Sequence, residues 1–105
     1  MKKIPLFEPN IGKLEKKMVM ASLNNNQIST YGYFTDLFIK EVQKITNSKY
    51  NLATNSGSAA LFLALKSVGV KRDEIVITQS YTFAATTNAI ILNHSTPLLL
   101  DISLE

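Results

Sequence analysis

The stretch that decides the fold is "NLATNSGSAALFLAL", Asn51–Leu65. It passes from an apolar segment through four small polar residues into an Ala- and Leu-rich run that favours a helix. The sequence after it predicts a strand at 75–79, a helix at 83–93 and a strand at 96–103. If "YNLAT" at 50–54 is a first strand, the elements alternate between strand and helix. This order predicts an α/β fold with a mainly parallel sheet and covering helices.

The part of the chain before this alternation predicts helices only. A first helix is expected from Ile11 to Leu23 with Asn10 as its N-cap, because Asn is a favoured capping residue. A second is expected from Phe34 to Thr46, where apolar residues recur at helical spacing. The predicted organisation is therefore an N-terminal helical segment over 1–48, followed by an incomplete βαβαβ unit over 49–105.

Composition indicates a globular protein. The chain has 105 residues, of which 46% are hydrophobic and 18% are charged. No apolar run approaches the roughly 20 residues that span a membrane. The absence of cysteine excludes disulfides and thiolate metal sites, and it favours the cytoplasm. All eleven Lys and Arg residues lie at or before Arg72, but they form no dense patch, so solvated helix faces are favoured over nucleic-acid binding.

The small residues before the helix allow two interpretations. A helix N-terminus carries unpaired N–H groups and a partial positive charge, which suit a phosphate. Gly57 would let the backbone approach the anion, Ser58 would add a hydroxyl, and Ala59 would keep the space open. The simpler interpretation is that Ser56 or Ser58 caps the helix, and these residues alone favour it. No Gly-Lys-Ser/Thr follows, so the stretch is not a Walker A motif.

The second candidate stretch is "ITQSYTFAATTNAI", in which Tyr81 and Phe83 follow the end of a predicted strand. Ligands of parallel α/β sheets bind at the carboxyl ends of strands, so the two rings could flank a planar group. Taken alone, packing of both rings in the core is favoured. The single histidine, His94, lies in a helix-to-strand turn without a second ligand at a suitable spacing, so no metal site is predicted.

Together these stretches resemble the DegT/DnrJ/StrS family of pyridoxal-phosphate-dependent sugar aminotransferases. The resemblance is carried by "NSGSAALFLALKSVGVKRDEIVITQSYTFAATTNAIILNHSTPLLLDIS", residues 55–103. It extends upstream through "PLFEPNIGKLEKKMVMASLNNNQISTYGYFTDLFIKEVQKIT", residues 5–46. Nearly the whole chain is covered. The resemblance implies the N-terminal part of the large domain of the aspartate-aminotransferase-like (type I) fold, with the small C-terminal domain absent.

The resemblance also implies roles for particular residues. Gly57, Ser58 and Ala59 would hold the phosphate of pyridoxal 5'-phosphate, and Phe83 would stack on its pyridine ring. The loop "QISTYG" would lie near the sugar, which makes substrate-binding candidates of two further residues, Thr30 and Tyr31.

The reaction implied is transfer of an amino group from an amino acid, typically L-glutamate, to a nucleotide-linked keto sugar for surface glycan or polysaccharide synthesis. The family works as a homodimer. In the family, the Schiff-base lysine and the acidic partner of the cofactor's pyridine nitrogen lie beyond the segment that matches Phe83. In this sequence no Lys or Arg follows Arg72. Asp101 matches a different acid of the family pattern. We therefore assign no catalytic residue, interpret the chain as an N-terminal fragment, and expect it to be inactive alone.

Two alternatives stay open at this point. The chain could be a small α/β module that binds a phosphorylated ligand or a protein without catalysis, with its open sheet edge as the partner surface. It could also come from an aminotransferase homologue that has become a regulator, which these residues do not separate from an enzyme.

Overall fold

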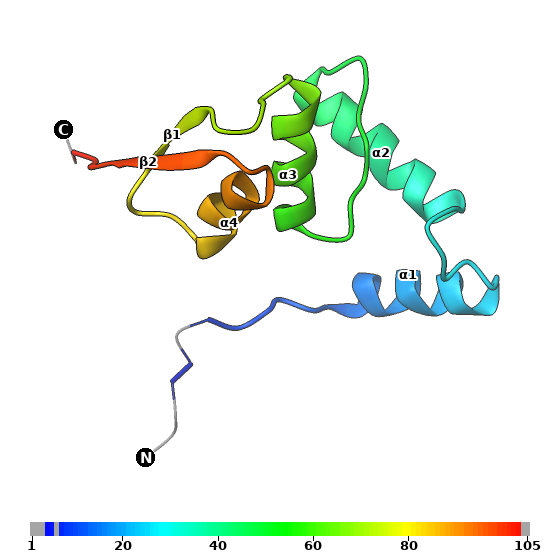
Figure 1. Ribbon diagram of the computed structural model, residues 1–105. Helices are drawn as coiled ribbons and strands as arrows, with labels where there is room; N and C mark the ends of the chain where they lie inside the picture. Colours follow the sequence, from blue (N-terminus) through cyan, green and yellow to red (C-terminus); the bar gives the residue numbers. More distant parts are fainter. Residues whose placement is uncertain (1–3, 6, 104–105) are drawn as a thin grey trace. The chain divides into compact units, whose positions relative to one another are not determined.

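The computed structural model describes residues 4–5 and 7–103. The chain divides into two compact units at Asn51 and Leu52. Within the described ranges, no helix has the length and apolar character to cross a membrane. The elements, shown in Figure 1, are α1 (Lys13–Asn24), α2 (Tyr33–Thr46), α3 (Gly57–Ser67), β1 (Ile75–Gln79), α4 (Ala84–Leu92) and β2 (Thr96–Leu100).

The first unit holds the two helices expected from the sequence, with one correction. Helix α1 begins after Gly12, so the prediction of Asn10 as its N-cap is wrong. The Glu15 carboxylate accepts the Gly12 N–H at 2.7 Å, and this bond closes the first turn two residues later than expected. At the far end of α2, Asn47 ends the helix in the left-handed conformation with φ 51°.

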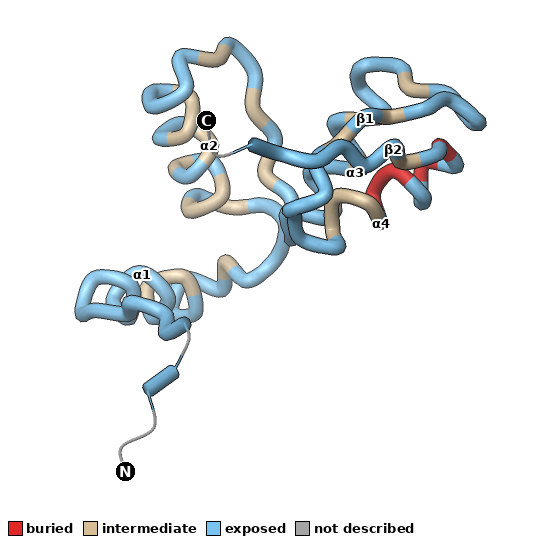
Figure 2. The backbone as a smooth tube through the Cα atoms, turned by 90° about the vertical axis from the view of Figure 1, so that its left-hand side faces the viewer, coloured by how far each residue is buried: buried red, intermediate tan, exposed pale blue. Residues whose placement is uncertain are grey.

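The second unit is built on a two-stranded parallel sheet. Strands β1 and β2 pair in register from Ile75 opposite Thr96 to Gln79 opposite Leu100. Helix α4 packs against both strands and against α3. The buried apolar residues of the unit are Ala89 and Ile90 of α4, which lie in the red stretch of Figure 2. The predicted α/β class, with a parallel sheet and covering helices, is confirmed.

The strand predicted at 50–54 is absent, and this prediction is wrong. Residues 50–54 carry no regular secondary structure. A β-strand is defined by hydrogen bonds to a neighbouring strand, and the described residues supply none beside this segment. The order of elements from α3 onward is therefore helix, strand, helix, strand.

A buried polar cluster joins the amino ends of the two strands. Asn93 is 1% exposed, and its Nδ2 donates to the Val70 carbonyl oxygen at 3.1 Å and to Ser95 Oγ at 3.0 Å. The Ser95 hydroxyl donates in turn to the Lys71 carbonyl oxygen at 3.0 Å. His94, with φ 60°, has an exposed side chain. These bonds hold the loop before β1 against the turn before β2.

Helix α3 ends at Ser67, and a glycine in the left-handed conformation follows two residues later. Gly69 has φ 82°, a backbone conformation that residues other than glycine rarely adopt. Its N–H donates to the Lys66 carbonyl oxygen, and the Val70 N–H donates to the Leu65 carbonyl oxygen, each at 3.1 Å. This pair of bonds is the Schellman motif, which satisfies the last carbonyl groups of the helix.

Candidate functional site

The N-terminus of α3 is capped, but not all of its backbone N–H groups have a hydrogen-bond acceptor. Ser56 Oγ accepts the Ala59 N–H at 3.2 Å, and the Ser56 carbonyl oxygen accepts the Ala60 N–H at 3.0 Å. Ser56 is thus the helix cap, as the simpler interpretation of this stretch proposed. The N–H groups of Gly57 and Ser58 have no hydrogen-bond partner among the described residues. Capping therefore leaves two donors that face outward from the helix end.

Gly57 is a glycine that the fold itself does not require. Its φ lies outside the left-handed region, and a Cβ atom added to it would meet no atom within 4 Å. Neither backbone strain nor internal packing therefore demands glycine here. A group that approaches from outside the chain would demand it, because a side chain at this position would occupy the space in front of the free N–H groups.

A cavity of about 400 Å³ lies just beyond the carboxyl end of β1. Two aromatic rings line it, and both are strongly exposed: Tyr81 by 82% and Phe83 by 88%. Gln79 and Thr82 complete the lining. Core packing, which the residues alone favoured, is therefore wrong for both rings. Exposed aromatic surface beside a cavity suits a planar ligand.

The segment that carries Phe83 is held at both of its ends. The Ser80 N–H donates to the Leu100 carbonyl oxygen at 2.7 Å, which fixes the chain as it leaves β1. The hydroxyls of Thr82 and Thr86 lie 2.8 Å apart, and the Thr86 N–H donates to the Phe83 carbonyl oxygen at 3.0 Å. Phe83 is the N-cap residue of α4. Its backbone is thus anchored while its ring is free.

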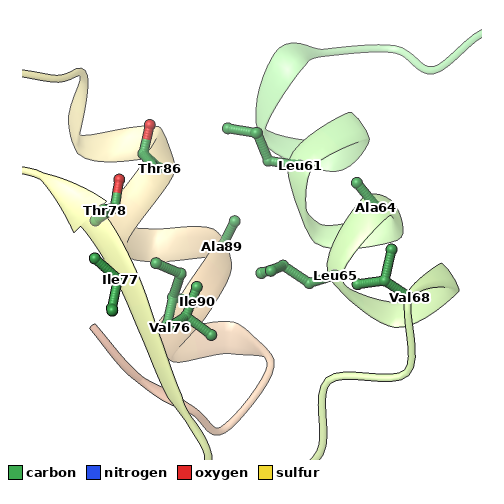
Figure 3. Close-up of a pocket in the computed structure, with 10 residues that line it drawn as sticks. All are labelled: Leu61, Ala64, Leu65, Val68, Val76, Ile77, Thr78, Thr86, Ala89 and Ile90. Atoms are coloured by element: carbon green, nitrogen blue, oxygen red, sulfur yellow. The ribbon is translucent and has the colours of Figure 1, made fainter. Parts of the chain in front are cut away.

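The two candidate segments occur at the same edge of the second unit. Figure 3 shows α3 and α4 side by side, with Leu61 and Thr86 at one end and Val68 at the other. Thr78, near the carboxyl end of β1, lies at the same end as Leu61 and Thr86. The N-termini of both helices therefore lie at the edge where the parallel strands end. This is the edge at which open α/β sheets bind ligands.

A second cavity, of about 510 Å³, adjoins the ends of both strands. It is lined by Ser80, Tyr81, Asp101 and Ile102, so Tyr81 contributes to both cavities. Asp101 Oδ1 accepts the Ile102 N–H at 2.9 Å. Gln79, Ser80 and Thr82 are not among the site residues expected from the sequence. Their position at the end of a predicted strand, or just after it, is the signal that could have found them.

No cluster of three or more His, Cys, Asp or Glu side chains suitable for a metal ion occurs in the described part of the chain.

The substrate candidates Thr30 and Tyr31 belong to the first unit, whereas the cofactor candidates belong to the second. The loop that holds them is organised by Gln27, whose side-chain oxygen accepts the Tyr33 N–H at 3.0 Å and whose carbonyl oxygen accepts the Ser22 hydroxyl. Tyr31 is 87% exposed. The role of Thr30 and Tyr31 in substrate binding stays a prediction.

Comparison with known proteins identifies the family. A model of the DegT/DnrJ/EryC1/StrS aminotransferase family matches residues 9–105. The chain belongs to this family. It is 39% identical over 99 residues to the spore coat polysaccharide biosynthesis protein SpsC of Bacillus subtilis, a match that covers 94% of the chain and 25% of SpsC. It is 31% identical to the GDP-perosamine synthase of Escherichia coli O157:H7, with 96% of the chain and 28% of the synthase covered.

Solved structures give the same result. The candidate sugar aminotransferase Spr1654 of Streptococcus pneumoniae, in its pyridoxal-phosphate form, superposes with a TM-score of 0.83 at 27% identity. The match covers 99% of this chain and 26% of Spr1654. The family resemblance and the large-domain fold expected from the sequence are confirmed. This member of the DegT/DnrJ/EryC1/StrS family spans about a quarter of the length of the relatives it matches.

Proposed function

We propose that the chain supplies the phosphate- and ring-binding part of the active site of a pyridoxal-phosphate-dependent sugar aminotransferase. The observation that carries the proposal is Gly57, a glycine with no internal need to be one, beside two free N–H donors. The exposed ring of Phe83, at the same edge of the unit, supports it. The residues present therefore suit a ligand with a phosphate at one end and a flat ring at the other.

Each residue has a distinct task in this proposal. The N–H groups of Gly57 and Ser58 donate to phosphate oxygens, and the Ser58 hydroxyl adds a third donor. The Ala59 N–H is already bonded to Ser56 Oγ, so Ala59 contributes a side chain small enough to leave room. Phe83 covers one face of the ring and leaves the other face to the substrate. When bound, pyridoxal phosphate supplies the electron-withdrawing ring that the transfer requires.

The proposed reaction moves an amino group from an amino acid, L-glutamate in our proposal, to a nucleotide-linked keto sugar. The sugar gains an amino group at its keto carbon, and the donor leaves as a 2-oxo acid. The names of SpsC and GDP-perosamine synthase support surface glycan or polysaccharide synthesis as the setting. We further propose a homodimer that acts in the cytoplasm, with Thr30 and Tyr31 near the sugar.

We assign no proton-transfer residue to this chain. No Lys or Arg follows Arg72, so the chain offers no lysine at the position that the family resemblance implies. We propose that residues 1–105 alone bind the cofactor weakly and do not transfer amino groups. Catalysis would need the lysine and the acidic residue that the family resemblance implies.

A chimera tests the proposed function. Residues 1–105 replace the matched 28% of the E. coli GDP-perosamine synthase. We expect the purified chimera to bind pyridoxal phosphate and to form GDP-perosamine, detected by mass spectrometry, whereas the synthase without the matched segment forms none. A chimera that folds as the parent does, shown by circular dichroism and gel filtration, but neither binds the cofactor nor forms product would contradict the proposal.

A further inference from the structure

Gln27 joins the end of α1 to the start of α2. Its N–H donates to the Ser22 carbonyl oxygen at 2.9 Å, and its carbonyl oxygen accepts the Ser22 hydroxyl. Its side-chain oxygen accepts the N–H of Tyr33, the first residue of α2, at 3.0 Å. The backbone of Gln27 is thus fixed to α1 and its side chain to α2. Residues 28–32 form a loop between these two anchors.

The Gln27 side chain also supplies an acceptor that the N-cap of α2 lacks. The N-cap residue is Gly32, which has no side chain to accept an N–H group. Gly32 has φ 145° and ψ 169°, a conformation that is essentially limited to glycine. A Cβ atom added to it would lie 3.3 Å from Gln27 Oε1 and 3.4 Å from Gln27 Cβ. The Gln27 side chain therefore lies against the backbone of Gly32 and fixes the point at which the loop enters α2.

The loop that Gln27 closes presents hydroxyl groups and an aromatic ring to solvent. Ser29, Thr30 and Tyr31 are exposed, and Tyr31 is so by 87%. Residues 28–31 make no hydrogen bond to any other described residue. Hydroxyl groups donate and accept hydrogen bonds, so three of them beside a ring suit a polyhydroxylated sugar. Because the loop has no hydrogen bond of its own, its conformation depends on the anchors at its two ends.

We propose that Gln27 is a positioning residue for the nucleotide-linked sugar, because it holds Thr30 and Tyr31 in the arrangement that binds the sugar. The inference rests on the proposed function, in which these two residues lie near the sugar. Loss of the Gln27 acceptor releases the loop at its α2 end. Binding must then order the loop, and this ordering costs affinity for the sugar but not for the amino acid.

Steady-state kinetics of the chimera test the inference. With GDP-perosamine and 2-oxoglutarate, the amino group leaves the sugar, whose carbon becomes a keto carbon, and 2-oxoglutarate becomes L-glutamate. In a ping-pong reaction, kcat/KM for each substrate reports only its own half-reaction. Gln27→Met keeps the side-chain length but lacks the acceptor, so kcat/KM for GDP-perosamine should fall about tenfold and that for 2-oxoglutarate should not change. Gln27→Glu keeps the acceptor and should keep both values.

Gln43→Met is the matched control. Gln43 Nε2 donates to the Lys49 carbonyl oxygen at 3.2 Å, so the variant removes another glutamine hydrogen bond from the same unit. Both kcat/KM values should stay unchanged. An equal fall for both substrates with Gln27→Met would overturn the inference, because a loss of stability alone lowers both. No fall, or the same loss with Gln27→Glu, would also overturn it.

Binding of GDP-perosamine, measured by calorimetry, separates this inference from the proposed function. A chimera that binds GDP-perosamine but neither binds the cofactor nor forms product refutes the proposed function alone. A Kd about tenfold higher with Gln27→Met then still supports the positioning role. A folded chimera that does not bind GDP-perosamine overturns the inference. If the chimera does not fold, the same titration uses the 105-residue chain.

A second variant covers a failure of Gln27→Met to fold. Gln27→Asn keeps the amide but is one carbon shorter, so its oxygen no longer reaches the Tyr33 N–H, and the same tenfold loss is expected. If neither variant folds, Gln27 serves stability alone and the inference is overturned.

Discussion

The two ends of the sheet in the second unit use polar groups in opposite ways. At the amino end of the strands, Asn93 and Ser95 are 1% and 7% exposed and bond to the loop that precedes β1. At the carboxyl end, Tyr81 and Phe83 are exposed, and the N–H groups at the start of α3 have no partner among the described residues. The first end thus stabilises the fold, whereas the second keeps its binding groups free. Substitutions at the two ends should therefore affect different measurements.

The largest effect is expected at the amino end. Asn93→Ala should lower the free energy of unfolding by about 2 kcal/mol, because it leaves the Val70 carbonyl oxygen and the Ser95 hydroxyl buried without their donor. Urea denaturation followed by circular dichroism measures the loss. Asn88→Ala, at an exposed position of the same helix region, is the control and should change stability by less than about 0.5 kcal/mol. Equal effects of the two variants would remove the distinction between the ends.

Gly57→Ala should act at the carboxyl end alone. The added methyl group meets no atom of the chain, so the urea midpoint should not fall and should rise slightly, because alanine restricts the unfolded chain more than glycine does. The same methyl group stands before the free N–H groups, so the affinity of the chimera for pyridoxal phosphate should fall about tenfold, the loss of roughly one hydrogen bond to a charged group. Absorbance titration with the cofactor measures it. Unchanged affinity would show that Gly57 only eases the turn.

Gly69→Ala is the matched substitution at the other end of α3, and its effect should be reversed. Because Gly69 has φ 82°, a side chain there is strained, and we expect a loss of about 1 kcal/mol in unfolding free energy. Cofactor affinity in the chimera should not change. The substitution at Gly69 would then lower the stability of the fold, whereas the substitution at Gly57 would lower the affinity for the cofactor. A loss of affinity with Gly69→Ala would contradict this assignment.

The smallest effect is expected at Phe83. Since the ring is 88% exposed, Phe83→Leu should change stability by less than about 0.5 kcal/mol. It removes the aromatic face, so cofactor affinity in the chimera should fall about threefold. Phe83→Tyr keeps the face and should keep the affinity. If Leu and Tyr behave alike in the cofactor titration, the ring does not stack on the ligand.

Much of the fold could be predicted from local sequence signals. The strand expected at 75–79 matches β1, and the helix expected at 83–93 contains α4. Ser56 caps α3, and the ordered small-residue and aromatic stretches are sufficient to indicate the family. These features depend on a few neighbouring residues, so the sequence contains what decides them. The proximity of the α3 and α4 N-termini followed from the expected parallel topology.

Other features depend on partners distant in the sequence, and only the tertiary structure decided them. The segment at 50–54 has the composition of a strand but no strand beside it, so it stays irregular. In the sequence, Asn93 has the character of an ordinary turn residue. In the structure it is buried, and it donates to the carbonyl oxygen of Val70. By itself, the sequence determined the four helices, two of the three expected strands and the family to which the chain belongs. The structure decided which edges, faces and polar groups find a partner, because pairing and burial are set by residues far apart in the chain.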